Sequence, residues 1–125
     1  MKTKRPVNLD LTTIHFPITA IVSITHRVSG VINVVGVLIL FWMLDASLRS
    51  PESFAELQQT LQHPFAMFIL WGVLAAFAWH FCMGIRHLVM DLGVGESFEG
   101  GKLGAKLAIA SAAVLILAAA GWIIW

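Results

Sequence analysis

Three long apolar runs, separated by short polar segments, set the pattern of the chain. They extend over about residues 21–48, 64–88 and 103–125. An α-helix rises ~1.5 Å per residue, so each run is long enough to cross the ~30 Å hydrocarbon core of a bilayer. Inside lipid the backbone polar groups must bond to one another, which favours helices. The pattern therefore predicts an all-α membrane protein with three transmembrane helices.

The polar segments predict how these helices are connected. Residues 1–20 precede the first helix, and the first 17 of them are polar or mixed. Between the first two runs lies "LRSPESFAELQQTLQHP", which favours a short interfacial helix over residues 53–62. Between the last two runs lies the glycine-rich turn "DLGVGESFEGGK". Since the chain is too short for several soluble domains, we expect residues 1–125 to form a single transmembrane domain.

The composition agrees with a membrane protein and excludes several classes of site. Hydrophobic residues make up 58% of the chain and charged residues 12%, whereas a soluble domain is about half apolar and about a quarter charged. The net charge of +1 gives no support to nucleic-acid binding. The single cysteine, Cys82, excludes an internal disulfide and any cysteine-based zinc or iron–sulfur site within this chain.

The basic residues predict the orientation in the membrane. Cytoplasmic loops carry an excess of Lys and Arg. With the N-terminus in the cytoplasm, seven of the eight basic residues lie on the inner side and only Arg49 lies outside. The seven are Lys2, Lys4, Arg5, Arg27, Arg86, Lys102 and Lys106. We therefore expect a cytoplasmic N-terminus and a C-terminus on the outer side.

His80 is the first candidate for chemistry. It lies in a run, residues 57–85, that contains no Asp, Glu, Lys or Arg, and polar groups in hydrocarbon are expensive and usually functional. Gly84 and His87 follow on the same stripe of the helix, and Gly84 would remove bulk beside the imidazole, as a large flat ligand requires. Neutral imidazole is a standard axial ligand of haem iron. A histidine that only hydrogen-bonds to a neighbouring helix fits the spacing equally well.

A second polar group lies near the start of the first helix, in "SITHRVSG" at residues 23–30. Ser23 and Arg27 share one stripe, and His26 lies on an adjacent stripe with Ser29 beside it. Because the first two long helices are antiparallel, these residues lie on the same side of the membrane as the histidine-bearing end of the second helix. There Arg27 and His26 could meet the propionates of a haem. An arginine that only extends to lipid phosphate is the alternative.

These motifs resemble those of a known family. "RPVNLDL" at residues 5–11, "SITHRVS" at 23–29 and "HFCMGIRHLVMD" at 80–91, together with the three-helix layout, resemble the cytochrome b subunit of succinate dehydrogenase. That subunit is one of two membrane anchors of respiratory complex II. The resemblance covers nearly the whole chain and implies a single transmembrane anchor domain in the bacterial inner membrane.

The resemblance also implies roles for individual residues. His80 matches the axial ligand of haem b. Ser23 and Arg27 match residues that line the ubiquinone pocket. Arg27, with His26, lies where the family holds the haem propionates. His87 has a plausible role on the same side, and a purely structural role for it stays equally open.

The resemblance implies partners as well. Residues 5–11 match a cytoplasmic stretch that abuts the hydrophilic subunits, namely the flavoprotein and the iron–sulfur subunit, which would carry electrons from succinate. Arg86 has a plausible role toward a propionate or at an interface. This chain has no dinucleotide fingerprint and no cysteine cluster, so no catalytic activity is expected from it alone.

If the haem is six-coordinate, its second ligand implies a second anchor subunit. Such a haem needs two axial ligands, and only His80 lies at mid-span depth, so the other ligand would come from another chain. The third helix carries a stripe of small residues, Gly104, Ala108 and Ala112, which allows close helix contact in lipid. That stripe could serve the second anchor subunit or packing within this chain.

Two alternative functions remain open from the sequence. The chain could be the equivalent anchor of a fumarate reductase, because an anchor does not fix the direction of the reaction. It could also be a purely structural anchor or an assembly protein whose histidines only pack.

Overall fold

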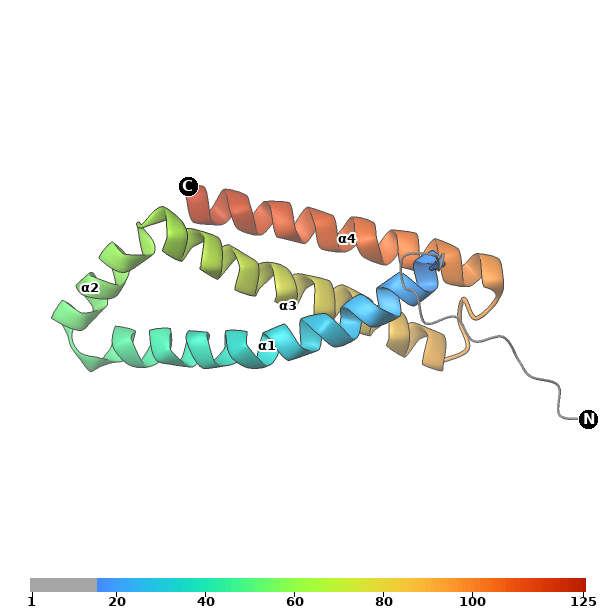
Figure 1. The fold of residues 1–125 in the computed structure, drawn as a ribbon, viewed down its shortest axis with the longest axis horizontal. Coiled ribbons are helices and arrows are strands. Elements are labelled where there is room, and N and C mark those ends of the chain that lie inside the picture. The colour runs from blue at the N-terminus through green and yellow to red at the C-terminus, as the bar shows by residue number, and fades with distance from the viewer. Residues whose placement is uncertain (1–15) are drawn as a thin grey trace, which may run out of the picture.

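The computed structural model describes residues 16–125, and this part of the chain folds into helices without a strand. The helices are α1 (Ile18–Arg49), α2 (Pro51–Leu61), α3 (Pro64–Asp91) and α4 (Phe98–Ile124) (Figure 1). Of these, α1, α3 and α4 are long and apolar enough to cross a membrane. The predicted all-α class with three long apolar helices is confirmed. Residues 5–11 and the basic residues Lys2, Lys4 and Arg5 lie outside the described residues.

Local sequence signals explain where the helices begin. Pro51 and Pro64 stand in the first turns of α2 and α3, where a missing N–H costs nothing. The Ser50 hydroxyl accepts a hydrogen bond from the backbone N–H of Ser53 at 3.0 Å, which caps α2. Ser97 caps α4 in the same way, since its Oγ accepts from the N–H of Gly100 at 3.0 Å. Each of these three helices therefore starts at a residue suited to the position.

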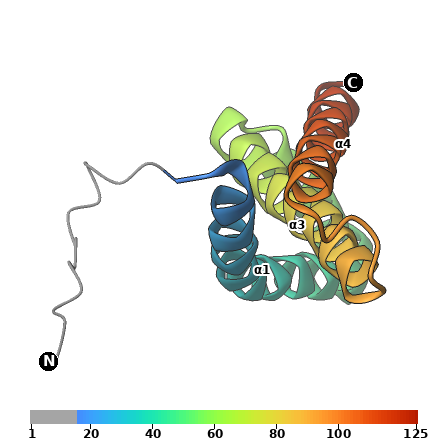
Figure 2. The same ribbon diagram turned by 90° about the vertical axis from the view of Figure 1, so that its right-hand side faces the viewer.

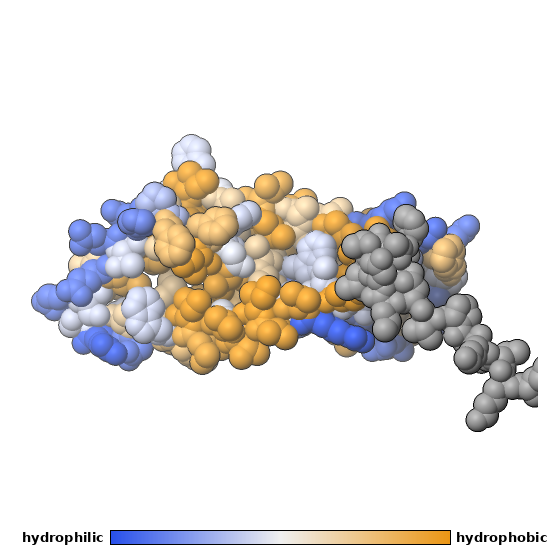
Figure 3. Space-filling view, in the orientation of Figure 1, coloured by the Kyte–Doolittle hydropathy of each residue, from blue (hydrophilic) through white to orange (hydrophobic). Residues whose placement is uncertain are grey.

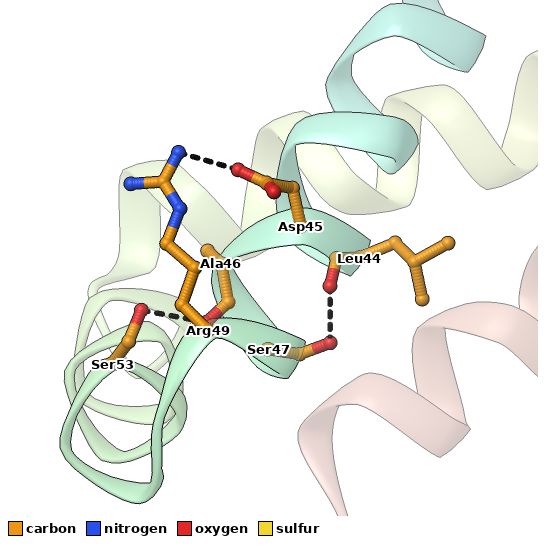
Figure 4. A network of polar contacts seen from close by, with 6 residues as sticks. All are labelled: Leu44, Asp45, Ala46, Ser47, Arg49 and Ser53. Atoms are coloured by element: carbon orange, nitrogen blue, oxygen red, sulfur yellow. Dashed lines mark hydrogen bonds and ion pairs between the residues drawn. The ribbon is translucent and has the colours of Figure 1, made fainter.

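The corner between α1 and α2 is held by polar contacts (Figure 4). The Arg49 guanidinium pairs with the Asp45 carboxylate one turn earlier. The Ser53 hydroxyl donates to the carbonyl oxygen of Ala46 at 2.6 Å, and the Ser47 hydroxyl donates to the carbonyl oxygen of Leu44 at 2.7 Å. Of these, the bond from Ser53 to Ala46 links α2 to α1 and holds the direction in which α2 leaves, whereas the other two lie within the last turns of α1.

Helix α3 lies between α1 and α4, and neighbouring long helices are antiparallel (Figures 1 and 2). The contact of α3 with α4 is the most extensive. Small side chains on α4 allow it, because Ala105, Ala108 and Ala112 are buried there. The Trp71 indole also donates to the carbonyl oxygen of Ile116 at 3.0 Å. At Ala108 and Ala112, therefore, the predicted stripe serves packing within this chain.

Glycine allows α1 and α3 to approach each other closely. A Cβ atom added at Gly36 would lie 3.0 Å from the Cγ1 atom of Val73, which is closer than normal packing permits. The two backbones can take this separation because Gly36 has no side chain. The contact lies midway along α1, so it sets the spacing of the pair at this level.

The outer surface has the polarity of a membrane protein. Hydrophobic residues cover the middle of the molecule and hydrophilic residues gather at its two ends (Figure 3). Large apolar side chains of α1 that no other described element covers include Val31, Val34, Leu38, Phe41 and Trp42. So much exposed apolar surface needs lipid or a partner to cover it.

Candidate functional site

Three histidines meet where α1 packs against α3, and we call them the imidazole cluster: His26 on α1, and His80 and His87 on α3. The rings of His26 and His80 are stacked, with centroids 4.1 Å apart and planes 9° apart. The ring of His87 lies 5.0 Å from that of His26 at a 45° tilt. The antiparallel packing thus brings together the histidines of two motifs that lie more than fifty residues apart.

The orientation of His80 is fixed by hydrogen bonds to α1. Its Nδ1 atom lies 3.0 Å from the backbone carbonyl oxygen of His26 and 3.1 Å from the hydroxyl oxygen of Ser29. The Ser29 hydroxyl itself donates to the same carbonyl oxygen at 2.8 Å. A carbonyl oxygen can only accept, so these contacts assign the proton to Nδ1. The lone pair of Nε2 is then free, as in a histidine that binds a metal.

A glycine on α1 makes room for the His80 imidazole. A Cβ atom added at Gly30 would lie 3.1 Å from the Cε1 atom of His80, so a larger residue would displace the ring. At Gly84 an added Cβ atom would make only an ordinary contact, 3.6 Å from the Nε2 atom of His26. The residue that leaves space for the His80 ring within this chain is therefore Gly30. The expectation that Gly84 makes room for a flat ligand at His80 stays a prediction.

Ser23 and Arg27 lie one turn apart on the continuous helix α1. Ser23 is half-buried, whereas Arg27 is exposed. The exposed Arg27 points away from the helix contacts of this chain, and His26, although next to it in sequence, turns toward α3. The structure therefore brings His26 to His80 and His87 to His26, but it does not bring Arg27 into the imidazole cluster.

Arg86 packs against α4, although its neighbour in sequence, His87, packs against α1. It is 8% exposed, and its Nη2 atom donates to the carbonyl oxygen of Gly101 on α4 at 3.3 Å. Adjacent residues of a helix point about 100° apart, so Arg86 faces α4 while His87 faces α1. Neither this contact with α4 nor the hydrogen bond between His80 and Ser29 was predicted from the sequence.

The donor set of the cluster fits a haem better than a bare metal ion. Within residues 16–125 no three His, Cys, Asp or Glu side chains converge on a metal-ion site. A haem iron held between two chains needs only one nitrogen from each, and His80 offers a single imidazole with Nε2 available. A ligating histidine whose other ring nitrogen donates to a backbone carbonyl is the usual arrangement at such centres.

Nearly the whole sequence matches one protein family. The family described as "Succinate dehydrogenase/Fumarate reductase transmembrane subunit" matches residues 1–119. The chain belongs to this family. It is a multi-pass membrane subunit of the succinate dehydrogenase/fumarate reductase family, and the resemblance stated from the sequence motifs is confirmed.

Individual relatives agree with the family. The "Succinate dehydrogenase cytochrome b556 subunit" of Coxiella burnetii is 42% identical over 124 residues, covering 98% of this chain and 99% of the relative. The protein of the same name from Paracoccus denitrificans is 32% identical over 111 residues, covering 89% of this chain and 85% of the relative. A mitochondrial "cytochrome b560 subunit" of succinate dehydrogenase from Dictyostelium discoideum is 30% identical over 115 residues. The similarity to succinate dehydrogenase subunits therefore extends over nearly the entire chain.

Proposed function

We propose that the chain is the membrane anchor subunit of a succinate dehydrogenase that binds haem b together with a second anchor subunit. Residues 1–125 would act as one transmembrane anchor domain and form part of the site where ubiquinone is reduced. The observation that carries this proposal is the hydrogen bonding of His80. Its Nδ1 atom bonds to the His26 carbonyl oxygen at 3.0 Å, which leaves Nε2 free to bind iron.

The imidazole cluster is the proposed haem-binding surface of this chain. His80 is the axial ligand, and the partner anchor supplies the second ligand. His26 and His87 lie on the propionate side, and Arg27 adds a positive charge at that end of α1. Haem b, when bound, supplies a one-electron redox centre. The names of the relatives as b-type cytochromes support this assignment.

Ser23 and Arg27 are the proposed quinone-binding residues. They share one face of α1, a turn apart. The Ser23 hydroxyl can donate a hydrogen bond to a quinone carbonyl. The fixed positive charge of Arg27 favours negative charge on the oxygen of the reduced quinone. This chain would thus hold and orient the quinone, while the electrons come from other subunits.

The remaining parts of the proposal concern the assembly. A flavoprotein and an iron–sulfur subunit would oxidise succinate and deliver the electrons, so this chain has no activity alone. It would lie in the bacterial inner membrane with its N-terminus in the cytoplasm and its C-terminus in the periplasm. The excess of basic residues near the N-terminus and near the turn between α3 and α4 supports this orientation.

The decisive test replaces the proposed ligand. In the His80→Ala variant of the intact complex, we expect the reduced-minus-oxidised spectrum to lose its low-spin b-type signal, because one axial nitrogen is gone. His63→Asn is the matched control, since His63 caps α3 at the opposite end of the helix and Asn is also a good cap. An unchanged low-spin spectrum in His80→Ala would disprove the ligand assignment. A wild-type complex without any b-type signal would favour a structural anchor instead.

A further inference from the structure

A groove runs between α3 and α4 and is lined in part by Arg86. The proposed function assigns no role to this groove. Its volume is about 480 Å³, within the ~300–1,000 Å³ range of small-molecule sites. Most of its wall is apolar. Residues that line it include Cys82, Ile85 and Val89 on α3 and Leu103, Leu107 and Ser111 on α4. The groove is therefore suited to a hydrocarbon chain.

The length and position of the groove match one leaflet of a bilayer. On α4 the lining extends from Gly100 to Ser111, and the eleven steps between these two residues rise roughly 16 Å along the helix. The hydrocarbon core is ~30 Å thick, so the groove is about as long as half of it. One end of the groove opens at the turn between α3 and α4, where Val94 and Gly95 line it. A chain lying in the groove would start at the membrane surface and end near the bilayer centre.

Arg86 gives the open end of this groove a positive charge. It is the only charged residue among the lining residues. Its side chain is more than nine-tenths buried, and its Nε atom has no hydrogen-bond partner among the described residues. Its Nη2 atom bonds to Gly101 in the first turn of α4, which places the guanidinium near the membrane surface. A buried cation with an unused donor is costly unless an anion or another acceptor meets it.

We propose that this groove binds an anionic phospholipid, whose phosphate meets Arg86 and one of whose acyl chains lies between α3 and α4. The apolar wall suits an acyl chain, and the groove is about as long as one leaflet is thick. The buried cation near the surface end suits the phosphate. Phosphate and guanidinium form charge-assisted hydrogen bonds. The site lies on the α4 side of α3, whereas the imidazole cluster lies on the α1 side, so the inference stands apart from the proposed function.

The first experiment compares lipids on the intact, delipidated complex. Retention of phosphatidylglycerol and of phosphatidylcholine with the same acyl chains is measured by native mass spectrometry. We expect wild type to prefer phosphatidylglycerol by about fivefold, because both lipids carry a phosphate but only phosphatidylglycerol has a net negative charge to pair with Arg86. Arg86→Gln should abolish that preference. Lys106→Gln, which removes an exposed cation outside the lining, should leave it intact. Equal retention of both lipids by wild type, or equal loss in both variants, would overturn the proposal.

A second variant tests the groove without touching the charge. A Cβ atom at Gly104 would lie 3.7 Å from the Nε atom of Arg86, an ordinary contact, so Gly104→Ala should be tolerated and should retain lipid. Gly104→Leu fills the groove and should reduce retention of both lipids. Unchanged retention in Gly104→Leu would exclude the groove as the binding place.

A crosslink identifies the occupant directly. The photoreactive amino acid p-benzoylphenylalanine is placed at Leu107, which lines the groove and is 59% exposed. Illumination of membranes should add the mass of a phospholipid to this chain. A crosslink to the second anchor subunit or to a quinone would refute the lipid assignment.

Discussion

At the scale of the residue, the chemistry depends on which hydrogen bonds each side chain makes. His80 is held through Nδ1 by one carbonyl and one hydroxyl from α1, so its ring cannot rotate freely about the Cβ–Cγ bond. Ser29 is 5% exposed and touches both the His26 carbonyl oxygen and His80. We therefore regard Ser29 as a positioning residue for the imidazole.

The role of Ser29 can be tested by removing its hydroxyl. In Ser29→Ala the His80 ring keeps the bond to the His26 carbonyl oxygen but loses its second partner. We expect the complex to retain haem with ~10–100-fold lower affinity, the usual effect of losing such a supporting bond, and a shifted midpoint potential. Haem content and redox titration measure these two quantities.

Ser47→Ala is the matched control for that change. Ser47 also lies on α1 and donates to the carbonyl three residues before it, but it lies at the other end of the helix. It should change neither haem content nor potential. Equal effects of the two variants would mean that the hydroxyl acts on the helix rather than on His80.

The quinone residues call for a separate measurement. Ser23→Ala removes a hydrogen bond with a net contribution of ~0.5–1.5 kcal/mol, and Arg27→Leu removes a charge, so its effect should be larger. Both should slow succinate-driven reduction of quinone but not of a soluble dye that accepts electrons upstream of the membrane. Arg49→Leu, an exposed arginine at the far end of α1, serves as control. An unchanged ratio of quinone to dye activity in both variants would require other residues to line the pocket.

Particular residues show how far the sequence could predict this site. The pairing of His26 with His80 follows from two antiparallel helices whose polar motifs lie at the same end. The direction of Arg86 did not follow, because α3 is apolar on all sides and gives no periodic signal for the face that each residue takes. The place of Gly30 also required the structure, since the rotation of α1 against α3 determines which glycine faces His80.

At the scale of the element, the packing of α1 on α3 depends on Gly36. Gly36→Ala would place a methyl group 3.0 Å from Val73, and we expect a loss of stability of ~1–3 kcal/mol from overpacking. Gly72→Ala is the control, because nothing lies within 4 Å of an added Cβ atom there, so it reports the helix propensity change alone. The apparent unfolding temperature of the solubilised complex measures both.

A double variant separates the steric cause from other effects of the Gly36 substitution. Val73→Ala removes the methyl group that the new Cβ atom would meet. Gly36→Ala combined with Val73→Ala should therefore be less destabilised than the sum of the two single changes. Strict additivity would show that Gly36 acts in some other way than by close contact.

The boundaries of the elements were partly predictable. Ser50 before Pro51, and Pro64 at the start of α3, are strong start signals, and α2 begins within two residues of the expected position. Helix α4 begins at Phe98, about five residues before the apolar run that predicts it. Its first five residues include Glu99 and Lys102. Both are charged, so a pattern based on hydrophobicity leaves this start of the helix out.

At the scale of the whole molecule, the long helices and the polar ends describe how the protein sits across a bilayer. Helix α1 has 32 residues and is roughly 48 Å long, longer than the ~30 Å hydrocarbon core. It must tilt or extend into the headgroup region. The polar contacts at the corner with α2 (Figure 4) lie at the C-terminal end of α1, where polar groups suit the headgroup region.

Topology is the prediction that belongs to this scale. A reporter fused before Met1 should be cytoplasmic, and one fused after Trp125 should be periplasmic, because seven of eight basic residues then lie inside. Paired alkaline phosphatase and fluorescent protein fusions distinguish the two sides. Both ends on one side would rule out three membrane crossings.

The imidazole cluster and the groove lie on different pairs of long helices, and this has a consequence for biogenesis. The imidazole cluster uses side chains of α1 and α3 only, and the groove that α4 forms lies on the opposite face of α3. A ribosome that has delivered the first 91 residues into the translocon has therefore supplied every histidine of the cluster. His26 and His80 can therefore stack as a helical hairpin before α4 enters the membrane, so the proposed haem ligand can be positioned before the last helix is inserted.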